Sequence, residues 1–392
     1  MKTSGMGLGV LCAIAGIYMA CSAGGGSTFN GSDDDGGTTG AAGSTGSFNP
    51  SGSGGGDAVC NSAATEDHDQ DGFTRNAGDC NDCDVNVNPG AVEVPTDAMD
   101  PEAKEADENC DGMIDEPATV CDTNTDLSST DGVLAAGAID LCKQAGASDW
   151  GILSAEFVRA NGTPAAPGVQ VGILDAFGSA VPPRAGSRML ALSSGHARAP
   201  NHPNPCNDYS CYTSGPGTPP PGFPQDVPSC SGATDINDDV ALQVQMRAPT
   251  NATGYSFDFT FYSFEYPEWV CTSFNDQFIA LVDPAPMGAI NGNISFDSMT
   301  NPVSVNIAFF QVCSGCPLGT QELAGTGFDV WDDAGATGWL VTQAPVEPGE
   351  EFSIRFAIWD TGDQAWDSTV LIDNFQWIAN AGTVTVGTEP VK

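Results

Sequence analysis

The second half of the chain alternates apolar and polar positions with the period of β-strands. The clearest run extends from Tyr255 to Phe264, where aromatic residues at every second position are separated by Ser, Asp and Thr. Such alternation sends successive side chains to opposite faces of a sheet. Residues 352–358 follow the same pattern. Further strands are expected at 150–159, 169–174, 188–193, 239–246, 277–283, 303–312 and 368–378.

A single helical pattern precedes these strands. Asp131 stands at its expected start and Gly146 at its expected end. The residues that share its apolar face are Leu134, Ala138, Leu141, Cys142 and Ala145. Many strands with one short helix predict a mainly β protein. We expect an antiparallel, jelly-roll-like β-sandwich over residues 127–382, followed by a C-terminal tail at 383–392.

Residues 200–230 interrupt the strands with nine prolines and three cysteines. Proline lacks the N–H group that a sheet ladder needs, so this stretch is predicted to be an inserted loop held by disulfides. Surface decoration is its expected role, with recognition as the alternative.

The N-terminus has the pattern of an export signal. Lys2 precedes an apolar run at 6–19, which closes with Tyr-Met-Ala before Cys21 and resembles a bacterial lipobox. We expect residues 1–21 to be a lipoprotein signal in which Cys21 receives the lipid. Ser22 after the cysteine favours the outer membrane, and ordinary secretion is the alternative. Residues 22–57 contain 13 Gly and predict a disordered tether.

Acidic residues dominate the charge of the chain, with 51 acidic against 11 basic residues and a net charge of −40. Such a surface repels nucleic acid and anionic lipid headgroups, which are therefore poor partners, and it attracts cations. Of 14 Cys, 12 remain once Cys12 and Cys21 are set aside. In an exported protein this predicts up to six disulfides of open connectivity, with a zinc or redox role for the two Cys-x-x-Cys pairs as the alternative.

The acids are concentrated in a module at 58–126. Between Asp57 and Asp126 there are 20 acids against only Arg75 and Lys104. A stretch this repulsive either stays disordered or is neutralised by bound cations and held by disulfides. An acidic spacer that binds ions only diffusely is the alternative to ordered metal sites.

The spacing of the acids favours ordered sites. Asp67, Asp69 and Asp71, followed by Gly72, give the D-x-D-x-D-G start of a calcium loop, in which alternate carboxylates converge on one hard cation. Position twelve is Gly78, so the loop is EF-like and not an EF-hand. Two further clusters follow, the last again D-x-N-x-D-G. The predicted ligands are Asp67, Asp69, Asp71, the Phe73 carbonyl, Asp79, Asn81, Asp82, Asp84, Asp107, Asn109, Asp111 and Asp115, with calcium favoured over magnesium.

These motifs carry a resemblance. Asp-x-Asp-Gly-Phe, Gly-Asp-Cys at 78–80, Asn-Pro-Gly-Ala-Val-Glu at 88–93 and Asn-Cys-Asp-Gly-x-Ile-Asp-Glu at 109–116 resemble the MopE-type metal-binding repeat. Such repeats occur in secreted and surface proteins of myxobacteria and their relatives. The resemblance covers about 66–116 and implies structural calcium binding. The acidic stretch 96–108 is longer here than in the family.

The second half resembles another family. Residues 259–280, 293–297 and 335–374, which include G-W-L-V-T-x-A-P-V, I-R-F-A-I-W-D-T-G-D and D-S-T-V-L-I-D-N-F, are similar to the choice-of-anchor L domain. The resemblance covers roughly 150–378. It implies a β-sandwich on an extracytoplasmic surface protein of a family without an established activity.

The sandwich offers one more candidate cation site. Asp360, Asp363 and Asp367 lie between two predicted strands, and Asp276 is expected to meet them in space. Calcium there would relieve their repulsion. The alternative is turn chemistry, in which Asp side chains accept backbone N–H groups.

Enzymatic activity is not expected. The paired carboxylates of a jelly-roll glycosidase, E-x-D-x-x-E, do not occur, and Ser194 next to His196 is not triad geometry. We therefore predict a lipid-anchored surface protein with structural calcium, whose sandwich serves adhesion to matrix, glycan or another surface protein. The alternatives are a structural subunit of a surface assembly and, last, an extracellular hydrolase.

Overall fold

The computed structural model describes residues 62–96, 105–117, 119–123, 125–147, 149–307, 309–330, 333–379 and 382–391. The predicted signal, the lipidation site Cys21 and the tether lie outside the described residues. Within the described ranges, no helix has the length and apolar character needed to cross a bilayer.

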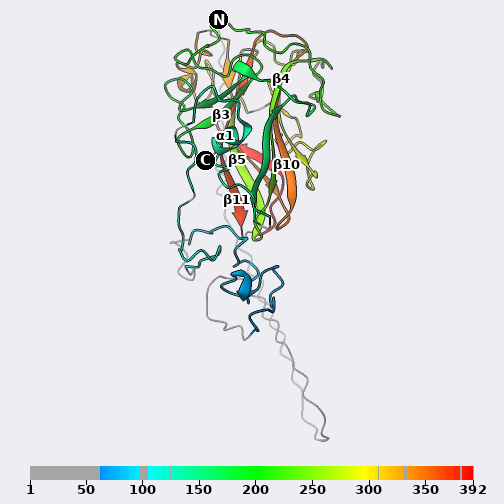
Figure 1. The fold of residues 1–392 in the computed structure, drawn as a ribbon. Helices are drawn as coiled ribbons and strands as arrows, with labels where there is room; N and C mark the ends of the chain where they lie inside the picture. The colour runs from blue at the N-terminus through cyan, green and yellow to red at the C-terminus, as the bar shows by residue number, and fades with distance from the viewer. Residues whose placement is uncertain are drawn as a thin grey trace, which may run out of the picture. The chain divides into compact units, whose positions relative to one another are not determined.

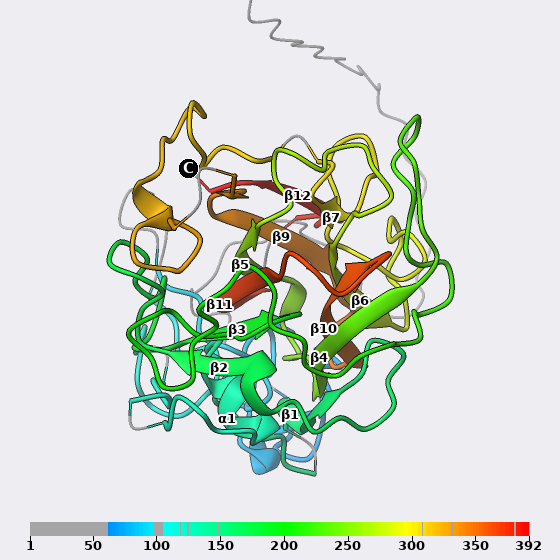
Figure 2. The same ribbon diagram turned by 90° about the horizontal axis from the view of Figure 1, so that it is seen from above.

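Two antiparallel sheets form the body of the protein (Figures 1 and 2), which confirms the predicted fold class. The five-stranded sheet has the order β1 (Gly151–Val158), β4 (Ile236–Arg247), β10 (Glu351–Thr361), β6 (Gln277–Asp283) and β7 (Val303–Ser304). The second sheet has the order β12 (Gly387–Pro390), β9 (Leu340–Pro345), β5 (Ala252–Ser263), β11 (Ser368–Ala379), β3 (Met189–Ser193) and β2 (Val171–Leu174), and β8 (Gly335–Ala336) pairs with β5.

The core lies between the sheets, where β5 places its predicted aromatic face. Phe257 of β5 meets Phe356 of β10 at a ring separation of 5.0 Å, and Phe259 meets Phe278 of β6 at the same distance. All four rings are fully buried. Burial of a Phe side chain contributes about 1.5–3 kcal/mol, so these cross-sheet contacts hold the layers together.

Loops cover parts of the outer faces as well. On the second sheet, Tyr262 packs against Phe177 and Phe328 from loops. On the first, Phe223 of the Pro-rich loop packs against Trp359 of β10 at 6.2 Å. As predicted, disulfides hold this loop; they are Cys206–Cys211 and Cys230–Cys271.

The predicted helix is real but much shorter than its pattern. It spans Gly132–Gly137 (α1), and the Asp131 carboxylate caps the N–H groups of Val133 and Leu134. The expected apolar face was wrong at its start, because Leu134 is 41% exposed. Single-turn 3-10 helices lie at Arg75–Ala77 (η1), Gly168–Gln170 (η2) and Gln321–Leu323 (η3).

Two strand predictions also need correction. The run 303–312 forms only the two residues of β7, because the chain turns after Ser304 while Val305 and Phe310 still reach the core. The buried apolar residues of this run therefore gave the sequence pattern of a strand without forming one. At the other end, β12 lies in the segment expected to be a tail and pairs with β9, a strand that the pattern did not predict.

Candidate metal centre

The first D-x-D-x-D-G loop folds around its own carboxylates. Asp67 accepts the N–H groups of Gln70 at 2.7 Å and Gly72 at 3.1 Å, and Asp71 accepts that of Phe73 at 2.7 Å. Gln70 and Gly72 have φ of 67° and 97°. The left-handed backbone at these two positions bends the loop toward its centre, as a glycine there permits.

The third loop repeats this fold. Asp107 accepts the N–H groups of Asp111 at 3.0 Å and Gly112 at 2.9 Å, and Asp111 accepts that of Met113 at 2.8 Å. Cys110 and Gly112 again have positive φ, 58° and 91°. The disulfide Cys80–Cys110 ties this loop to the segment that follows the first one.

The carboxylates of the first loop converge. Oxygens of Asp67, Asp69 and Asp71 lie within 4.8 Å of one another, and so do oxygens of Asp69, Asp79 and Asp82. Asp69 belongs to both groups. The structure thus brings together five of the predicted ligands, from two segments that are separated in the sequence.

Three oxygens in this cluster are buried without a hydrogen-bond partner. They are the Oδ2 atoms of Asp69, Asp71 and Asp79. Burial is the main cause that raises the pKa of each carboxyl, and neighbouring acids add to it; for Asp71 the pKa rises to about 6. An unpartnered charged oxygen costs about 1–3 kcal/mol or more when it is buried. A hard cation would remove that cost.

Other predicted ligands in the first half of the module organise turns. The carboxylate of Asp82, which is fully buried, accepts the N–H of His68 at 2.9 Å and the hydroxyl of Ser62. These two bonds lower its pKa. Asp84 accepts both nitrogens of Asn86 at 3.2 Å. The N–H of Asn81 donates to Asp79 at 2.8 Å, and the Phe73 carbonyl stays a predicted ligand.

The third loop does not gather its acids in the same way. Within the described residues, Asp107, Asp111 and Asp115 form no group of three with oxygens inside 4.8 Å. Asn109 donates instead to Glu116 at 2.9 Å, and Glu93 accepts the N–H groups of Asn109 and Asp115. Glu93 was not among the predicted ligands, although it ends the Asn-Pro-Gly-Ala-Val-Glu motif.

That motif also joins the module to the sandwich. The Asn251 side chain, next to β5, donates to the carbonyl of Val92 at 2.8 Å and accepts its N–H at 2.9 Å. The Trp150 indole donates to Ala91 at 3.0 Å, and Thr250 donates to Asn88 at 2.7 Å. Acid loops and sandwich are therefore connected by specific hydrogen bonds.

At one end of the sandwich, Asp276, Asp360 and Asp367 of the predicted second cation site are all buried, but within the described residues no three acids there have oxygens inside 4.8 Å. Asp363 is exposed and accepts the N–H of Ala365 at 3.0 Å, which is the turn role that was the alternative. Glu265, which the sequence did not indicate, is buried beside Asp276 and accepts its N–H at 3.4 Å.

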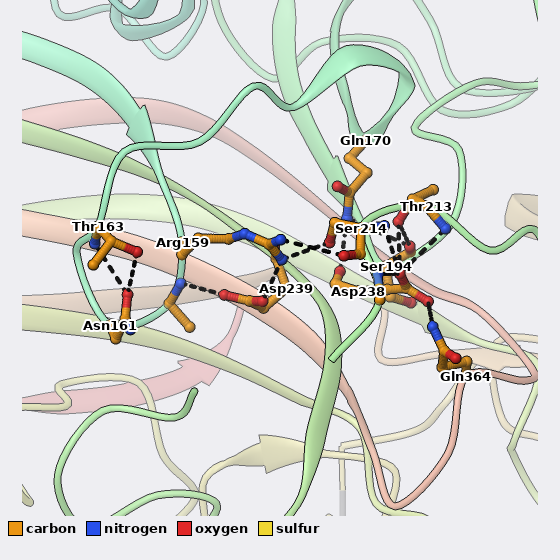
Figure 3. Close-up of polar contacts among 12 residues, drawn as sticks. Arg159, Asn161, Thr163, Gln170, Ser194, Thr213, Ser214, Asp238, Asp239 and Gln364 are labelled. Carbon is orange, nitrogen blue, oxygen red and sulfur yellow. Dashed lines mark hydrogen bonds and ion pairs between the residues drawn. The ribbon is translucent and has the colours of Figure 1, made fainter. Parts of the chain in front are cut away.

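A polar network beside this end fixes the Pro-rich loop (Figure 3). The Oδ1 atom of Asp238 accepts three consecutive backbone N–H groups, at 2.5–3.1 Å, from Thr213, Ser214 and Gly215. Asp239 pairs with Arg159 at 2.7 Å. Both acids are buried and fully partnered, so this network is structural.

The zinc and nucleophile interpretations lose support from the geometry, whereas a disulfide within a Cys-x-x-Cys pair is also the oxidised form of a redox pair and does not bear on the redox alternative. Cys313 and Cys316 are bonded to each other, and Cys80 is bonded to Cys110. The Ser194 hydroxyl donates to the Ser368 carbonyl at 3.3 Å, whereas His196 Nδ1 lies 2.9 Å from the Asn204 carbonyl. Ser194 and His196 therefore serve different contacts.

Comparison with known proteins gives one family match. The model of the choice-of-anchor L domain matches residues 165–376, which are more than half of the chain. No curated protein matches. A crystal structure of β-glucosidase from Kluyveromyces marxianus is similar over 51% of this chain and 18% of its own, at 10% identity and a TM-score of 0.19. This chain thus corresponds to less than a fifth of that enzyme, and the likeness carries no argument.

Proposed function

Because the chain belongs to the choice-of-anchor L domain family, a family of surface proteins, we propose that it is held at the outer membrane by a lipid on Cys21. In this proposal the acidic module binds calcium as a structural element. The sandwich is then presented outside the cell for adhesion to glycan, matrix or another surface protein, without catalysis. The MopE-type resemblance of the module supports the same reading.

One observation supports the calcium role above all others: Asp69 belongs to one group of converging carboxylates with Asp71 and to another with Asp79, and each of the three has a buried oxygen without a hydrogen-bond partner. Three carboxylates that repel one another stay together in a module with little apolar core only if something compensates their charge. Calcium does so with 6–8 oxygen ligands in flexible geometry. Magnesium demands a near-ideal octahedron, which one loop plus a remote carboxylate suits less well.

Calorimetric titration of the purified chain with calcium tests this role. We expect saturable binding and a higher unfolding temperature in calcium than in EDTA, because an ion that binds only the folded state stabilises it. The double variant Asp69→Asn/Asp71→Asn should lose this site. Glu347→Gln, which removes an exposed carboxylate from the turn before β10, is the charge control and should bind as the wild type does. Equal binding by wild type and double variant would overturn the proposal.

The lipid anchor has its own test. In cells fed with a labelled fatty acid, the wild-type chain should take up the label and stay with the membrane fraction. Cys21→Ser should carry no label and appear in the medium. If the label persists in this variant, Cys21 is not the anchor.

Adhesion is supported by a cavity of about 170 Å³ whose lining combines aromatic and polar side chains, among them Phe264, Phe328, Asn207 and Arg198. This volume is below the roughly 300–1,000 Å³ of most ligand sites, so the cavity would hold only part of a glycan. The purified chain should bind matrix polysaccharide from the producing cells and remain monomeric in sedimentation. Self-association without polysaccharide binding would favour the structural-subunit alternative.

A further inference from the structure

Four carboxyl groups are buried together at one end of the sandwich. Glu265, Asp276, Asp360 and Asp367 have exposed fractions of only 2%, 0%, 1% and 4%. Carboxylates are almost never this buried unless hydrogen bonds, a bound proton, a counter-charge or a metal compensates them.

The four groups come from both sheets. Asp360 lies in β10 and Asp276 directly precedes β6, both in the first sheet, whereas Glu265 and Asp367 flank β5 and β11 of the second. Asp276 spans the layers, because its Oδ1 accepts the N–H of Thr361 at 2.9 Å and its Oδ2 the hydroxyl of Ser368 at 2.6 Å. Whatever neutralises this cluster therefore acts where the two sheets meet.

Asp360 differs from the other three. Asp276 has the two donors just described, Asp367 accepts the N–H of Cys211 at 2.9 Å, and Glu265 accepts that of Asp276. Neither oxygen of Asp360 accepts a hydrogen bond in good geometry, although the residue is 99% buried; the polar groups beside it are the Ser194 hydroxyl and the Asp276 carboxyl. A buried carboxylate with two free oxygens is an unfinished ligand set.

The charged groups around Asp360 are acidic and do not neutralise it. Burial raises the pKa of Asp360 well above its usual value, and the charges of Asp276, Asp367 and Glu265 raise it further. The charged groups that most affect the pKa of Asp367 are likewise acids, Asp276, Asp238 and Asp208. The ion pairs of the described residues use other acids, among them Asp239 and Asp258.

We propose that a hard divalent cation, calcium in preference to magnesium, binds at the end of the sandwich with Asp360 as its central ligand. Asp276, Asp367 and Glu265 surround it. No three of these described carboxyl groups have oxygens all within 4.8 Å, so in this arrangement at most two of them would bind the ion directly, and water would have to supply the other ligands. Asp367 lines the cavity described above, which gives the ion a route from solvent. This site is independent of the one in the acidic module.

Calcium-binding stoichiometry of the full chain, measured by equilibrium dialysis, separates the two sites. Asp360→Asn should bind about one ion fewer than the wild type, and so should Asp69→Asn/Asp71→Asn. The combined variant should lose about two. If the loop variant keeps its calcium, the proposed module site fails while this one stands. If Asp360→Asn keeps all of its calcium, the inference made here is overturned.

Thermal unfolding of the same variants distinguishes a ligand from a merely structural residue. In EDTA, Asp360→Asn should unfold at a higher temperature than the wild type, because the wild-type carboxyl must either bury a charge or take up a proton on folding, and both cost stability at neutral pH. In calcium the order should reverse, with the variant lower by about 4 °C. Asp297→Asn is the matched control, since Asp297 is buried but accepts three hydrogen bonds. It should lose stability equally in both conditions, and the same behaviour by Asp360→Asn would overturn the proposal.

Discussion

The guanidinium of Arg159 donates to the fully buried carboxylate of Asp239 at 2.7 Å and also holds Ser214 of the Pro-rich loop (Figure 3). The second oxygen of Asp239 accepts the N–H of Ala160 at 2.7 Å. One carboxylate thus fastens the end of β1, the start of β4 and the inserted loop to one another.

Loss of this carboxylate should be costly. Asp239→Ala is expected to lower the free energy of unfolding by about 3 kcal/mol, at the low end for a buried ion pair because Arg159 is partly exposed. Denaturant titration measures the change. Glu351→Ala is the comparison, because it breaks an exposed pair with Arg247 and should cost less than about 1 kcal/mol. Equal decreases in the free energy of unfolding would show that the buried ion pair stabilises the protein no more than the exposed one.

Gly90 lies between the first D-x-D-x-D-G loop and the sandwich. A Cβ atom at this position would lie 2.9 Å from Thr250 Cγ2 and 3.1 Å from the Phe73 ring. Gly90→Ala should therefore displace Phe73, whose N–H donates to Asp71, and weaken calcium binding about tenfold, or about 1.4 kcal/mol. Gly382→Ala, where a Cβ has open space, is the control in the same calorimetric titration. Unchanged affinity in Gly90→Ala would show that the loop tolerates the displacement.

The two hydrogen bonds between Asn251 and Val92 predict a local effect. Asn251→Ala should leave the sandwich folded and speed the hydrogen exchange of the Val92 amide, which loses its acceptor. Each bond contributes about 1 kcal/mol, so the exchange should accelerate roughly five- to thirtyfold. Amides in the centre of β5 serve as internal controls. Protection of Val92 that survives the substitution would mean that other contacts hold the module.

The carboxyl group of Asp140 should make the stability of the protein depend on pH. Burial, followed by the charge of Asp122, raises the pKa of Asp140 to about 6. A carboxyl with a higher pKa in the folded state binds its proton more tightly when folded, so its contribution to stability falls as the pH rises from about 4 to about 6. Asp140→Asn should remove this loss and gain on the order of 1 kcal/mol at pH 7.5, with partial exposure discounted. Asparagine also accepts the φ of 69°.

The control for this prediction is the neighbouring acid. Asp122 accepts the N–H groups of Ser187 at 2.7 Å and Arg188 at 2.6 Å, so Asp122→Asn should destabilise the protein. Unfolding measured between pH 4 and pH 8 compares the two. A wild-type pH profile identical to that of Asp140→Asn would contradict the raised pKa.

Local sequence patterns predicted those elements whose structure depends on interactions between residues close together in the sequence. The alternation from Tyr255 to Phe264 located β5 because one face of that strand is buried between the sheets. The D-x-D-x-D-G spacing located the first loop because its turns are closed by its own side chains. The four-residue strand β12 has no such signal, since only its pairing with β9 makes it a strand.

The candidate site in the sandwich was only partly predictable for the same reason. Asp360 and Asp367 lie near each other in the sequence, and this proximity led to the prediction of a site there. Glu265 lies almost 100 residues before Asp360, beside a Tyr-Pro pair that reads as a turn. The packing of β5 against β10, which belong to different sheets, brings Glu265 into the cluster. The hydrophobic periodicity of the sequence does not indicate such a long-range contact.

The strand order has a consequence for how the chain acquires its fold. Among the strands of the described residues, only β2 with β3 and β6 with β7 are neighbours both in the sequence and in a sheet. The central positions between β4 and β6, and between β5 and β3, are taken by β10 and β11, which come late in the chain, at residues 351–361 and 368–379. Chains dominated by distant pairings fold slowly, on the scale of milliseconds to seconds. Each sheet therefore remains split until β10 and β11 are available, so the sandwich closes only after nearly the whole chain has been made.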